Sequence, residues 1–375
     1  MIRHDVSSAA VLSATETGQP SSLPADSPGD GLALSLTPIQ LGEHRLSGPV
    51  FVAPMAGVTD RPFRQLCKRL GAHYAVSEMA ASNPALWHTV KTARRLDHHG
   101  ETEPRAVQIA GADPAMMAQA ARYNVEHGAQ IIDINMGCPA KKVCKVAAGS
   151  ALMGQPALAM AIIDAVVRAV DVPVTLKMRT GPDASRRNAA GLARDAERAG
   201  IRMITIHGRT RACGYRGLAE YRTIAEVREA IRIPLVANGD IDGPAKAHQV
   251  LRATGADAIM IGRAAQGNPF IFREIAHALR TGRRLAPPTL AEIHQVLREH
   301  LLEHYEFHGE FTGVRTARKH VGWTLQADPR LAPHLPRFHA LETAEAQIAY
   351  IDRLFDGVAA NDSDLMTNPT RRIAA

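Results

Sequence analysis

The sequence Ile-Ile-Asp-Ile-Asn-Met-Gly-Cys-Pro-Ala-Lys-Lys-Val occupies residues 131–143. It begins with a short apolar run that stops abruptly at polar and turn-forming residues. A run of this kind is typical of a parallel strand that is buried on both faces, and Gly-Cys-Pro indicates a tight loop at its end. Cys138 is therefore either a catalytic acid or nucleophile at a strand end, or a small buried residue that fills a turn.

The same pattern recurs between about residues 40 and 282. Each apolar run ends in a polar or glycine-rich signature, and a segment with helical periodicity follows. The runs are Val50–Ala53, Tyr74–Val76, Ala106–Ile109, Ile131–Ile134, Val174–Leu176, Met203–Ile206, Leu235–Ala237 and Ala258–Ile261. Eight such units predict an α/β fold, a closed (β/α)₈ TIM barrel. The alternative is an open doubly wound sheet, which does not usually need eight strands that each end in a polar signature.

The rest of the chain divides around this predicted barrel. Residues 1–37 are rich in Ser, Pro, Ala and Gly, which predicts a disordered extension before a barrel at 38–286. After Pro287 the apolar residues recur at spacings of three and four, which predicts a small helical domain over 287–358. The polar residues 359–375 are expected to form a disordered tail.

Composition narrows the class of protein. The chain has 375 residues, of which 46% are apolar, and a formal net charge of +7. This charge favours a polyanionic partner such as nucleic acid, although many basic enzymes bind none. The four cysteines lack paired spacing, so neither a disulfide nor a metal site is predicted. With no membrane-length apolar run and no secretory signal pattern, we expect a cytoplasmic protein without a membrane partner.

Polar side chains follow the predicted strands. Because catalytic groups of a (β/α)₈ barrel lie at the carboxyl ends of its strands, these side chains should meet at one mouth. Lys177 could instead be a surface lysine or a Schiff-base lysine, and His207 could be a structural histidine. The candidate groups are the amides of Gln108 and Asn135, the bases Lys177 and His207, the thiol of Cys138 and the guanidinium of Arg263.

Three glycine-containing turns at strand ends indicate a phosphate-bearing cofactor. Asn238-Gly239-Asp240 and Gly262-Arg263 belong to the last two units, where barrels most often bind phosphate. Pro54-Met55-Ala56-Gly57, at the first strand end, would allow the backbone to approach a flat ring closely. Each motif taken singly is also ordinary turn chemistry.

A basic stripe marks the predicted helical domain. Arg315, Arg318 and Lys319 are three and four residues apart, while Val314 and Ala317 fall on the other helix face. The stripe suits contacts with phosphates, but a solvated charged face has the same pattern.

Seven of these signatures, in this order, resemble those of the bacterial tRNA-dihydrouridine synthases, and in particular their B-type branch. The resemblance extends from about residue 40 to about residue 355. Two departures are the extension before residue 38 and Thr324, which stands where related sequences tend to have an aromatic residue. The matching signatures are APMAGVTDRPFR (53–64), QIAG (108–111), DINMGCPAKK (133–142), HGRTR (207–211), NGDI (238–241), IGRAA (261–265) and ARKH (317–320).

The resemblance implies an FMN-binding barrel that acts as a monomer. Its reductant would be NADPH, or possibly NADH, and its reaction would be reduction of the C5–C6 double bond of a tRNA D-loop uridine, at position 17 for a B-type enzyme. Asn135 would contact the uracil, Cys138 would protonate C5, and tRNA would lie against Arg209, Arg211, Arg315, Arg318 and Lys319. The residues that would hold FMN are Pro54, Met55, Ala56, Gln108, Lys177, His207, Asn238, Gly239, Asp240, Gly262 and Arg263.

The two lysines beside the thiol qualify this picture. Lys141 and Lys142 would lower the pKa of Cys138 if they pointed at it, and so reduce the fraction of active acid. We therefore predict that both face RNA phosphates. Two other functions stay open, namely an FMN barrel that acts on a small molecule and an RNA-binding protein that has lost catalysis.

Overall fold

The computed structural model describes residues 31–35 and 37–367, with 361–367 as backbone only. Nearly all of the extension predicted at 1–37 therefore lies outside the described residues, as do residues 368–375 of the predicted tail. Within the described segment Leu32 is buried, and the Leu34 amide donates to the Leu279 carbonyl at 2.9 Å. The last residues of the extension thus pack against the barrel.

A parallel sheet forms the centre of the larger domain. Its neighbours follow in the order β4-β3-β11-β10-β9-β8-β7-β6-β5. The ring closes between β4 and β6 through a parallel bridge from Val76 to Ala106 and a 3.0 Å hydrogen bond from the Ser77 amide to the Ala106 carbonyl. The strands are β3 (Val50–Val52), β4 (Tyr74–Ala75), β5 (Ala80–Ala81), β6 (Ala106–Ala110), β7 (Ile131–Met136), β8 (Val174–Arg179), β9 (Met203–His207), β10 (Leu235–Asn238) and β11 (Ala258–Ile261).

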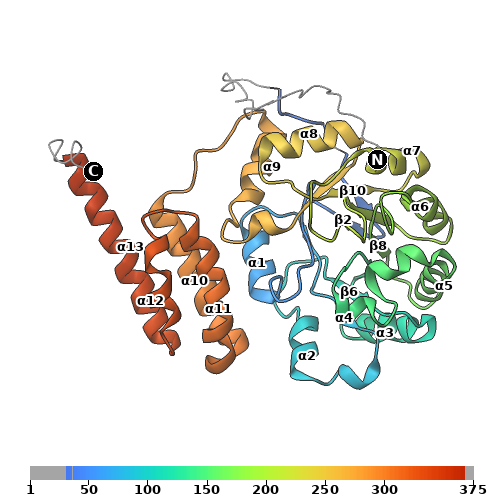
Figure 1. The fold of residues 1–375 in the computed structure, drawn as a ribbon, viewed down its shortest axis with the longest axis horizontal. Helices are drawn as coiled ribbons and strands as arrows, with labels where there is room; N and C mark the ends of the chain where they lie inside the picture. Colours follow the sequence, from blue (N-terminus) through green and yellow to red (C-terminus); the bar gives the residue numbers. More distant parts are fainter. Residues whose placement is uncertain (1–30, 36, 368–375) are drawn as a thin grey trace, which may run out of the picture.

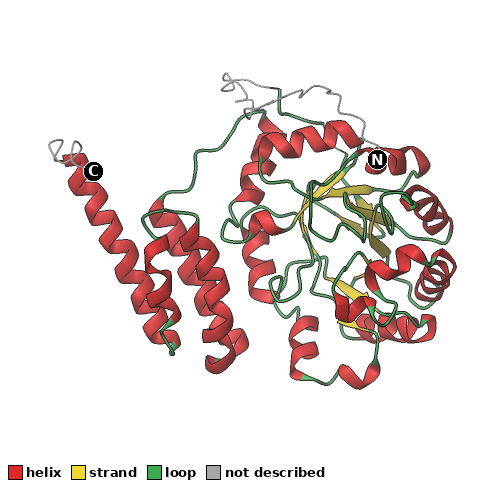
Figure 2. Ribbon diagram, viewed as in Figure 1, coloured by secondary structure: helices red, strands yellow, loops and turns green. Residues whose placement is uncertain are grey.

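This closed ring confirms the predicted (β/α)₈ barrel and excludes the open sheet. Each of the eight predicted runs forms a strand, and β4 and β5 are two pieces of the second one, interrupted at residues 76–79. Helices surround the strands in Figures 1 and 2. They are α1 (Arg61–Arg69), η1 (Pro84–Leu86), α2 (Val90–Leu96), α3 (Pro114–Glu126), α4 (Lys141–Cys144), η2 (Gly149–Gly154), α5 (Pro156–Val167), α6 (Ala189–Arg198), α7 (Arg222–Ala230), α8 (Pro244–Thr254), η3 (Arg263–Ala265) and α9 (Ile271–Thr281).

Alternation along the strands decides which side chains face the barrel axis. In β9, Ile204 and Ile206 pack outward in the cluster beneath the helices, whereas Met203 belongs to the central cluster. Successive side chains point to opposite faces, so His207 at the end of β9 also points inward. In β7, β9 and β10 the inward positions are apolar at the start of the strand and polar at its carboxyl end.

A small hairpin covers the opposite end of the barrel. Strands β1 (Gln40–Leu41) and β2 (His44–Arg45) pair antiparallel just before β3. Leu41 and Leu46 from this hairpin are buried in the same cluster as Phe51, at the amino ends of the strands. The barrel is therefore sealed by apolar side chains at this end.

The second domain is helical, as predicted, and lies beside α1 in Figure 1. Its last helix continues to Thr367, so the segment expected to be disordered from residue 359 is helical through 367. Extending an existing helix requires little free energy once packing, here of Phe355 and Val358, has formed it. The elements are α10 (Leu290–His308), α11 (Glu310–Gln326), η4 (Ala332–His334), α12 (Leu335–His339) and α13 (Ala344–Thr367).

Close backbone contact joins the two domains. Helix α10 packs against α1, and Arg94 donates to the carbonyl of His308 at 2.8 Å. Gly267, in the segment between η3 and α9, has a φ of +75°, and a Cβ there would lie 2.5 Å from the carbonyl carbon of Trp323. Only glycine fits this contact, which sets how α11 lies against the barrel. None of the helices in the described part of the chain is long and apolar enough to cross a membrane.

Candidate active site

The carboxyl ends of β6 to β10 bring together the side chains expected at the mouth. Asn135 and Lys177 are direct partners across β7 and β8, and His207 and Asn238 are partners across β9 and β10. Gln108 also faces inward from β6, where it pairs with Asp133 of β7, and is buried. The structure thus places these predicted site residues together inside the carboxyl end of the barrel.

A chain of hydrogen bonds links Cys138 to a buried carboxylate. The Cys138 amide donates to Asn135 Oδ1 at 3.0 Å, and Asn135 Nδ2 donates to Gln108 Oε1 at 2.6 Å. Gln108 Nε2 then donates to Asp133 Oδ2 at 2.6 Å, while the Thr175 hydroxyl donates to Asp133 Oδ1 at 2.6 Å. Since a carboxylate accepts and an amide N–H donates, this chain fixes the orientation of both side-chain amides.

Asp133 anchors the site without having been identified from sequence. It is the inward residue one layer below Asn135, and burial raises its pKa above the ordinary value although Gln108, Thr175 and Lys177 act in the opposite direction. The signal was available in the run at 131–136, because an acidic residue inside an otherwise apolar buried strand requires a partner.

Lys177 and His207 sit in a cationic environment. Lys177 Nζ donates to Asn238 Oδ1 at 2.9 Å, and Asn238 Nδ2 donates to the Met260 carbonyl at 2.7 Å. Burial, with the charge of Arg179, lowers the pKa of Lys177 to about 8. Burial, together with the nearby lysine and arginines, lowers the pKa of His207 to about 2, so its imidazole is neutral at physiological pH.

Asp240 holds two arginines at the mouth. Its carboxylate accepts from Arg209 at 2.7 Å, from Arg263 at 3.2 Å and from the Ala219 amide at 2.7 Å. Although partial burial acts to raise it, the pKa of Asp240 lies below the ordinary value because of these three donors. Arg209 is only 4% exposed. Its guanidinium is enclosed and paired with Asp240, and the contact of Arg209 with RNA stays a prediction.

Arg179 is a site residue that the sequence analysis missed. This last residue of β8 is buried and donates to the carbonyls of Gly137 at 2.7 Å and Gly214 at 2.8 Å. It therefore ties the Cys138 loop to the loop after β9. Its guanidinium lies 5.5 Å from the ring centroid of Tyr215. The guanidinium of Arg263 lies 5.2 Å from the same centroid, and Tyr215 is 57% exposed. The signal was its place two residues after Lys177, in phase with the inward positions.

The Cys138 thiol is half-buried beside these cations. Burial raises its pKa above the ordinary cysteine value, outweighing the amide of Ala140 and the charges of Arg179 and Lys177. Lys141 and Lys142 are exposed and are not among the groups that shift this pKa. At neutral pH the side chain is therefore a protonated thiol, able to donate a proton.

The turn after β3 is held from three directions. The Met55 amide donates to Thr59 Oγ1 at 2.8 Å, and the Gly57 amide donates to the buried Glu78 at 2.6 Å. From the helical domain, Lys319 Nζ donates to the Gly57 carbonyl. This bond joins α11 to the turn that carries Pro54, Met55 and Ala56, and the contact of Lys319 with tRNA stays a prediction.

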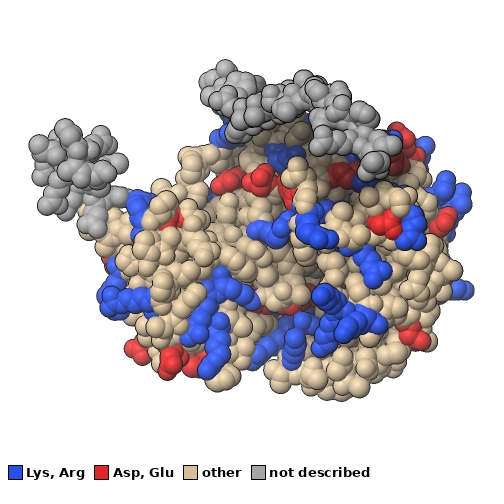
Figure 3. Space-filling model, in the orientation of Figure 1, with Lys and Arg blue, Asp and Glu red and all other residues tan. Residues whose placement is uncertain are grey.

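Of the predicted RNA contacts, Arg211 and Arg315 are exposed. Arg315 lies 3.7 Å from the ring centroid of Phe311, itself 72% exposed, while Arg318 is half-buried and donates to the Leu341 carbonyl at 3.3 Å. Figure 3 shows Lys and Arg side chains on both sides of the boundary between barrel and helical domain. This face has the charge expected of a surface that meets phosphates.

Comparison with known proteins adds to this geometry. The family model described as dihydrouridine synthase matches residues 51–349. The chain is 57% identical over 317 residues to tRNA-dihydrouridine synthase B of Pseudomonas aeruginosa, covering 84% of this chain and 96% of that protein. It is 56% identical over 324 residues to the protein of the same name from Shewanella oneidensis, covering 86% and 100%.

Among solved structures, the complex of 2-naphthoyl-CoA reductase with 2-naphthoyl-CoA superposes with a TM-score of 0.51 at 11% identity, covering 65% of this chain and 52% of that one. At this level of identity the likeness concerns the fold alone.

Proposed function

Because this chain belongs to the dihydrouridine synthase family, we propose that it reduces one D-loop uridine of tRNA to 5,6-dihydrouridine, with FMN as bound cofactor and NADPH or NADH as reductant. Membership of the family makes it an oxidoreductase. The observation that supports the finer assignment is the half-buried thiol of Cys138 at the barrel mouth, on a loop that bonds to Asn135 and Arg179. A thiol in this place is the acid that the second half of such a reduction requires.

The residues at the mouth fit a flavin. Lys177 carries a half-buried ammonium, and the one hydrogen bond that the described structure gives its Nζ goes to the neutral amide of Asn238. An electron-rich ring edge would supply the charge complement that this cation lacks. Arg263, 55% exposed in its side chain and oriented by Asp240, suits the phosphate. The residues that we assign to FMN are those that occupy the matching positions of the family's motifs.

FMN, when bound and reduced, would supply the hydride for C6 of the uracil. Negative charge then develops over C5 and the C4 carbonyl, and the Cys138 thiol donates a proton to C5. Asn135 has both lone-pair directions of Oδ1 used by the amides of Gly137 and Cys138. One Nδ2 hydrogen points only at Met79 Sδ at 3.8 Å, a weak partner, and is available to a uracil carbonyl.

The tRNA must present an unstacked base, because a base inside a folded helix cannot reach the mouth. Arg211, Arg315 with Phe311, and Lys141 and Lys142 supply the exposed cations and the aromatic ring that would hold the RNA. The chain acts as a cytoplasmic monomer on position 17, the site expected for its B-type relatives.

The test is positional mapping of dihydrouridine. Purified protein should be yellow, and under anaerobic conditions NADPH should bleach it. Adding tRNA from a strain that lacks the gene should restore the colour and yield dihydrouridine at position 17. Dihydrouridine at another D-loop position would contradict only the assignment to position 17. Bleaching without any tRNA product, with turnover of a small unsaturated carbonyl compound instead, would refute the tRNA assignment.

The raised pKa of Cys138 predicts the pH dependence of this half-reaction. Since the protonated thiol is the active form, Cys138 should cause no loss in the rate of reoxidation of reduced protein by tRNA between neutral pH and about pH 8.5, the ordinary cysteine value. Beyond the raised pKa the rate should fall about tenfold per pH unit. Stopped-flow absorbance measures it, and reduction by NADPH is the control that should lack this limb. A rate that rises with pH would indicate a thiolate nucleophile.

A further inference from the structure

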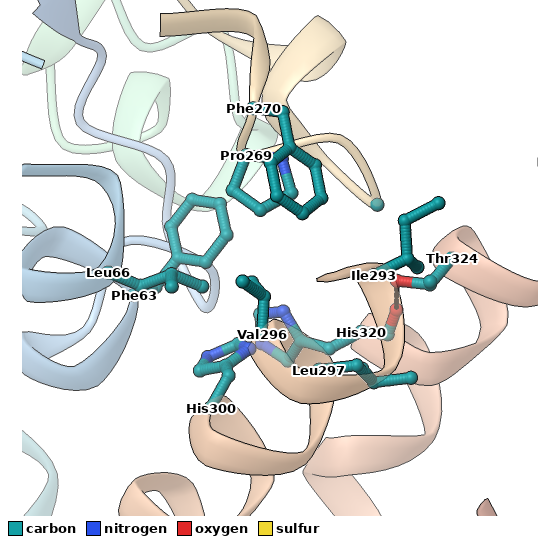
Figure 4. Close-up of a pocket in the computed structure, with 11 residues that line it drawn as sticks. Phe63, Leu66, Pro269, Phe270, Ile293, Val296, Leu297, His300, His320 and Thr324 are labelled. Atoms are coloured by element: carbon teal, nitrogen blue, oxygen red, sulfur yellow. Dashed lines mark hydrogen bonds between the residues drawn. The ribbon is translucent and has the colours of Figure 1, made fainter. Parts of the chain in front are cut away.

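A group of buried histidines lies where the helical domain meets the barrel. His300 and His304 belong to α10 and His320 to α11, and their exposed fractions are 4%, 1% and 4%. The His300 and His320 ring centroids are 4.8 Å apart, and those of His304 and His320 are 5.3 Å apart. Figure 4 shows His300 and His320 together, beneath Phe63 of α1.

Each of these rings has a buried nitrogen that lacks a hydrogen-bond partner among the described residues. The atoms are His300 Nε2, His304 Nδ1 and His320 Nε2. More than nine in ten buried polar groups in proteins are partnered, so three unpartnered nitrogens in one cluster require an explanation.

The tautomer of His304 follows from its neighbours. The Thr316 hydroxyl donates to the Thr312 carbonyl at 2.7 Å, so Thr316 Oγ1 accepts from His304 Nε2 at 2.8 Å. In a neutral ring Nδ1 then carries a lone pair, and this atom lies 3.6 Å from Asp60 Oδ2. Two electron-rich atoms facing one another in a dry interior favour a cation between them.

We propose that His300, His304 and His320 bind one divalent transition-metal ion of the zinc class, with Asp60 as its neighbouring negative charge. The ligand atoms that the three rings offer lie within 4.8 Å of one another. A tetrahedral zinc site, with Zn–N bonds of about 2.1 Å, needs separations of about 3.4 Å, which small side-chain rotations can supply. Imidazole ligands without thiolate suit Zn²⁺, Co²⁺ and Ni²⁺ better than Mg²⁺ or Ca²⁺.

The alternative to a metal is a shared proton, which the surroundings disfavour. Burial lowers the pKa of all three imidazoles, for His300 to about 3, although the Asp60 charge acts in the opposite direction. Neutral imidazole is the form that binds metal ions. Although burial acts to raise it, the pKa of Asp60 lies well below the ordinary value because of the neighbouring histidines, of which His308 Nε2 bonds the carboxylate at 2.8 Å, so Asp60 retains a negative charge.

The ion would connect three helices of the two domains. Asp60 caps α1 by accepting from the Phe63 amide at 3.1 Å, and it also bonds His308 Nε2 at 2.8 Å at the end of α10. His320 directly follows Lys319, which contacts the turn after β3. A metal here would therefore fix the orientation of the helical domain relative to the barrel mouth.

The test uses full-length protein without an affinity tag, stripped with a chelator and then titrated with Zn²⁺ or Co²⁺. We expect one ion per chain by elemental analysis, visible absorption of tetrahedral Co²⁺, and a higher Tm with metal. Because His300→Gln and His320→Gln remove ligands, each should weaken binding by more than the roughly 100-fold that loss of an outer-shell partner costs. His339→Gln changes an exposed histidine of α12 and should bind as wild type does.

Two outcomes would overturn the proposal. One is a wild-type chain that retains none of Zn²⁺, Co²⁺ and Ni²⁺ after dialysis, a result that does not depend on whether any variant folds. The other is a folded His300→Gln or His320→Gln chain that binds the ion as tightly as wild type. Metal content is read independently of flavin and of activity, so neither outcome bears on the proposed reduction of tRNA.

Discussion

Replacing Cys138 with alanine is expected to lower the rate of dihydrouridine formation by about 10²–10⁴-fold, the range typical of a lost general acid. The flavin and tRNA should still bind, because the Cys138 backbone amide, which the variant keeps, makes the bond to Asn135. Reduction by NADPH should be unchanged. The measurement is single-turnover product formation from pre-reduced protein.

Cys144 provides the matched control. It is also half-buried, and its Sγ lies 3.6 Å from the Cys138 carbonyl, but it does not extend from the end of β7. Cys144→Ala should retain most of the activity. An undiminished single-turnover yield in Cys138→Ala would remove the thiol from the mechanism, and an equal loss in both variants would indicate a distorted loop.

Replacing Arg64 with leucine is expected to lower the free energy of unfolding by about 3–5 kcal/mol, the cost of leaving a buried charge unpaired. Arg64 in α1 is 1% exposed and donates to Glu101 at 2.7 Å and to the Thr59 carbonyl at 2.9 Å. After the substitution, the buried carboxylate of Glu101 would have only Lys68, at 3.4 Å, as a cationic neighbour. Denaturant-induced unfolding followed by circular dichroism measures the loss.

Two further variants show whether the loss of stability in Arg64→Leu comes from the unpaired buried charge. Arg222→Leu breaks an exposed pair with Glu226 on α7 and should change the unfolding free energy by less than about 0.5 kcal/mol. Removing both buried charges, with Arg64→Leu and Glu101→Leu, should recover most of the stability. If Arg64→Leu unfolds at the same denaturant concentration as wild type, this pair does not stabilise the domain.

The pair of Arg64 and Glu101 also makes the free energy of unfolding depend on pH. Although burial acts to raise it, the pKa of Glu101 is lowered by Arg64 and Lys68. Because the folded pKa is below the unfolded one, the stabilisation is present above the unfolded pKa and is lost as the pH falls through the folded pKa. Arg64→Leu should therefore lose part of the acid sensitivity that wild type shows.

The strands and the inward polar residues could be read from sequence because both depend on local patterns. A buried parallel strand requires a continuous apolar run, and a barrel places every run's last inward residue at one mouth. Lys177 and His207 were found in this way. The partners of Arg209 and Lys319 were not found, because folding supplies them from distant segments, namely Asp240 for Arg209 and the Gly57 carbonyl for Lys319.

Distance along the chain also explains what was missed. Asp60 and His304 come within 3.6 Å although they belong to different domains. His300 and His304 are visible as a helical pair at a spacing of four, but His320 joins them only through the packing of α11 on α10. Periodicity within one helix carries no information on which second helix covers it.

The hairpin β1–β2 leaves the barrel with a single entrance. Among the described residues, Leu41 and Leu46 close the amino ends of the strands, so the proposed reductant and RNA would both approach from the side of Cys138 and Lys177. Under the proposed function, the nicotinamide would have to depart before a uridine could take its place. The protein would therefore work in two successive half-reactions at one site. The reductant would first transfer electrons to the flavin, and the tRNA would later take them up.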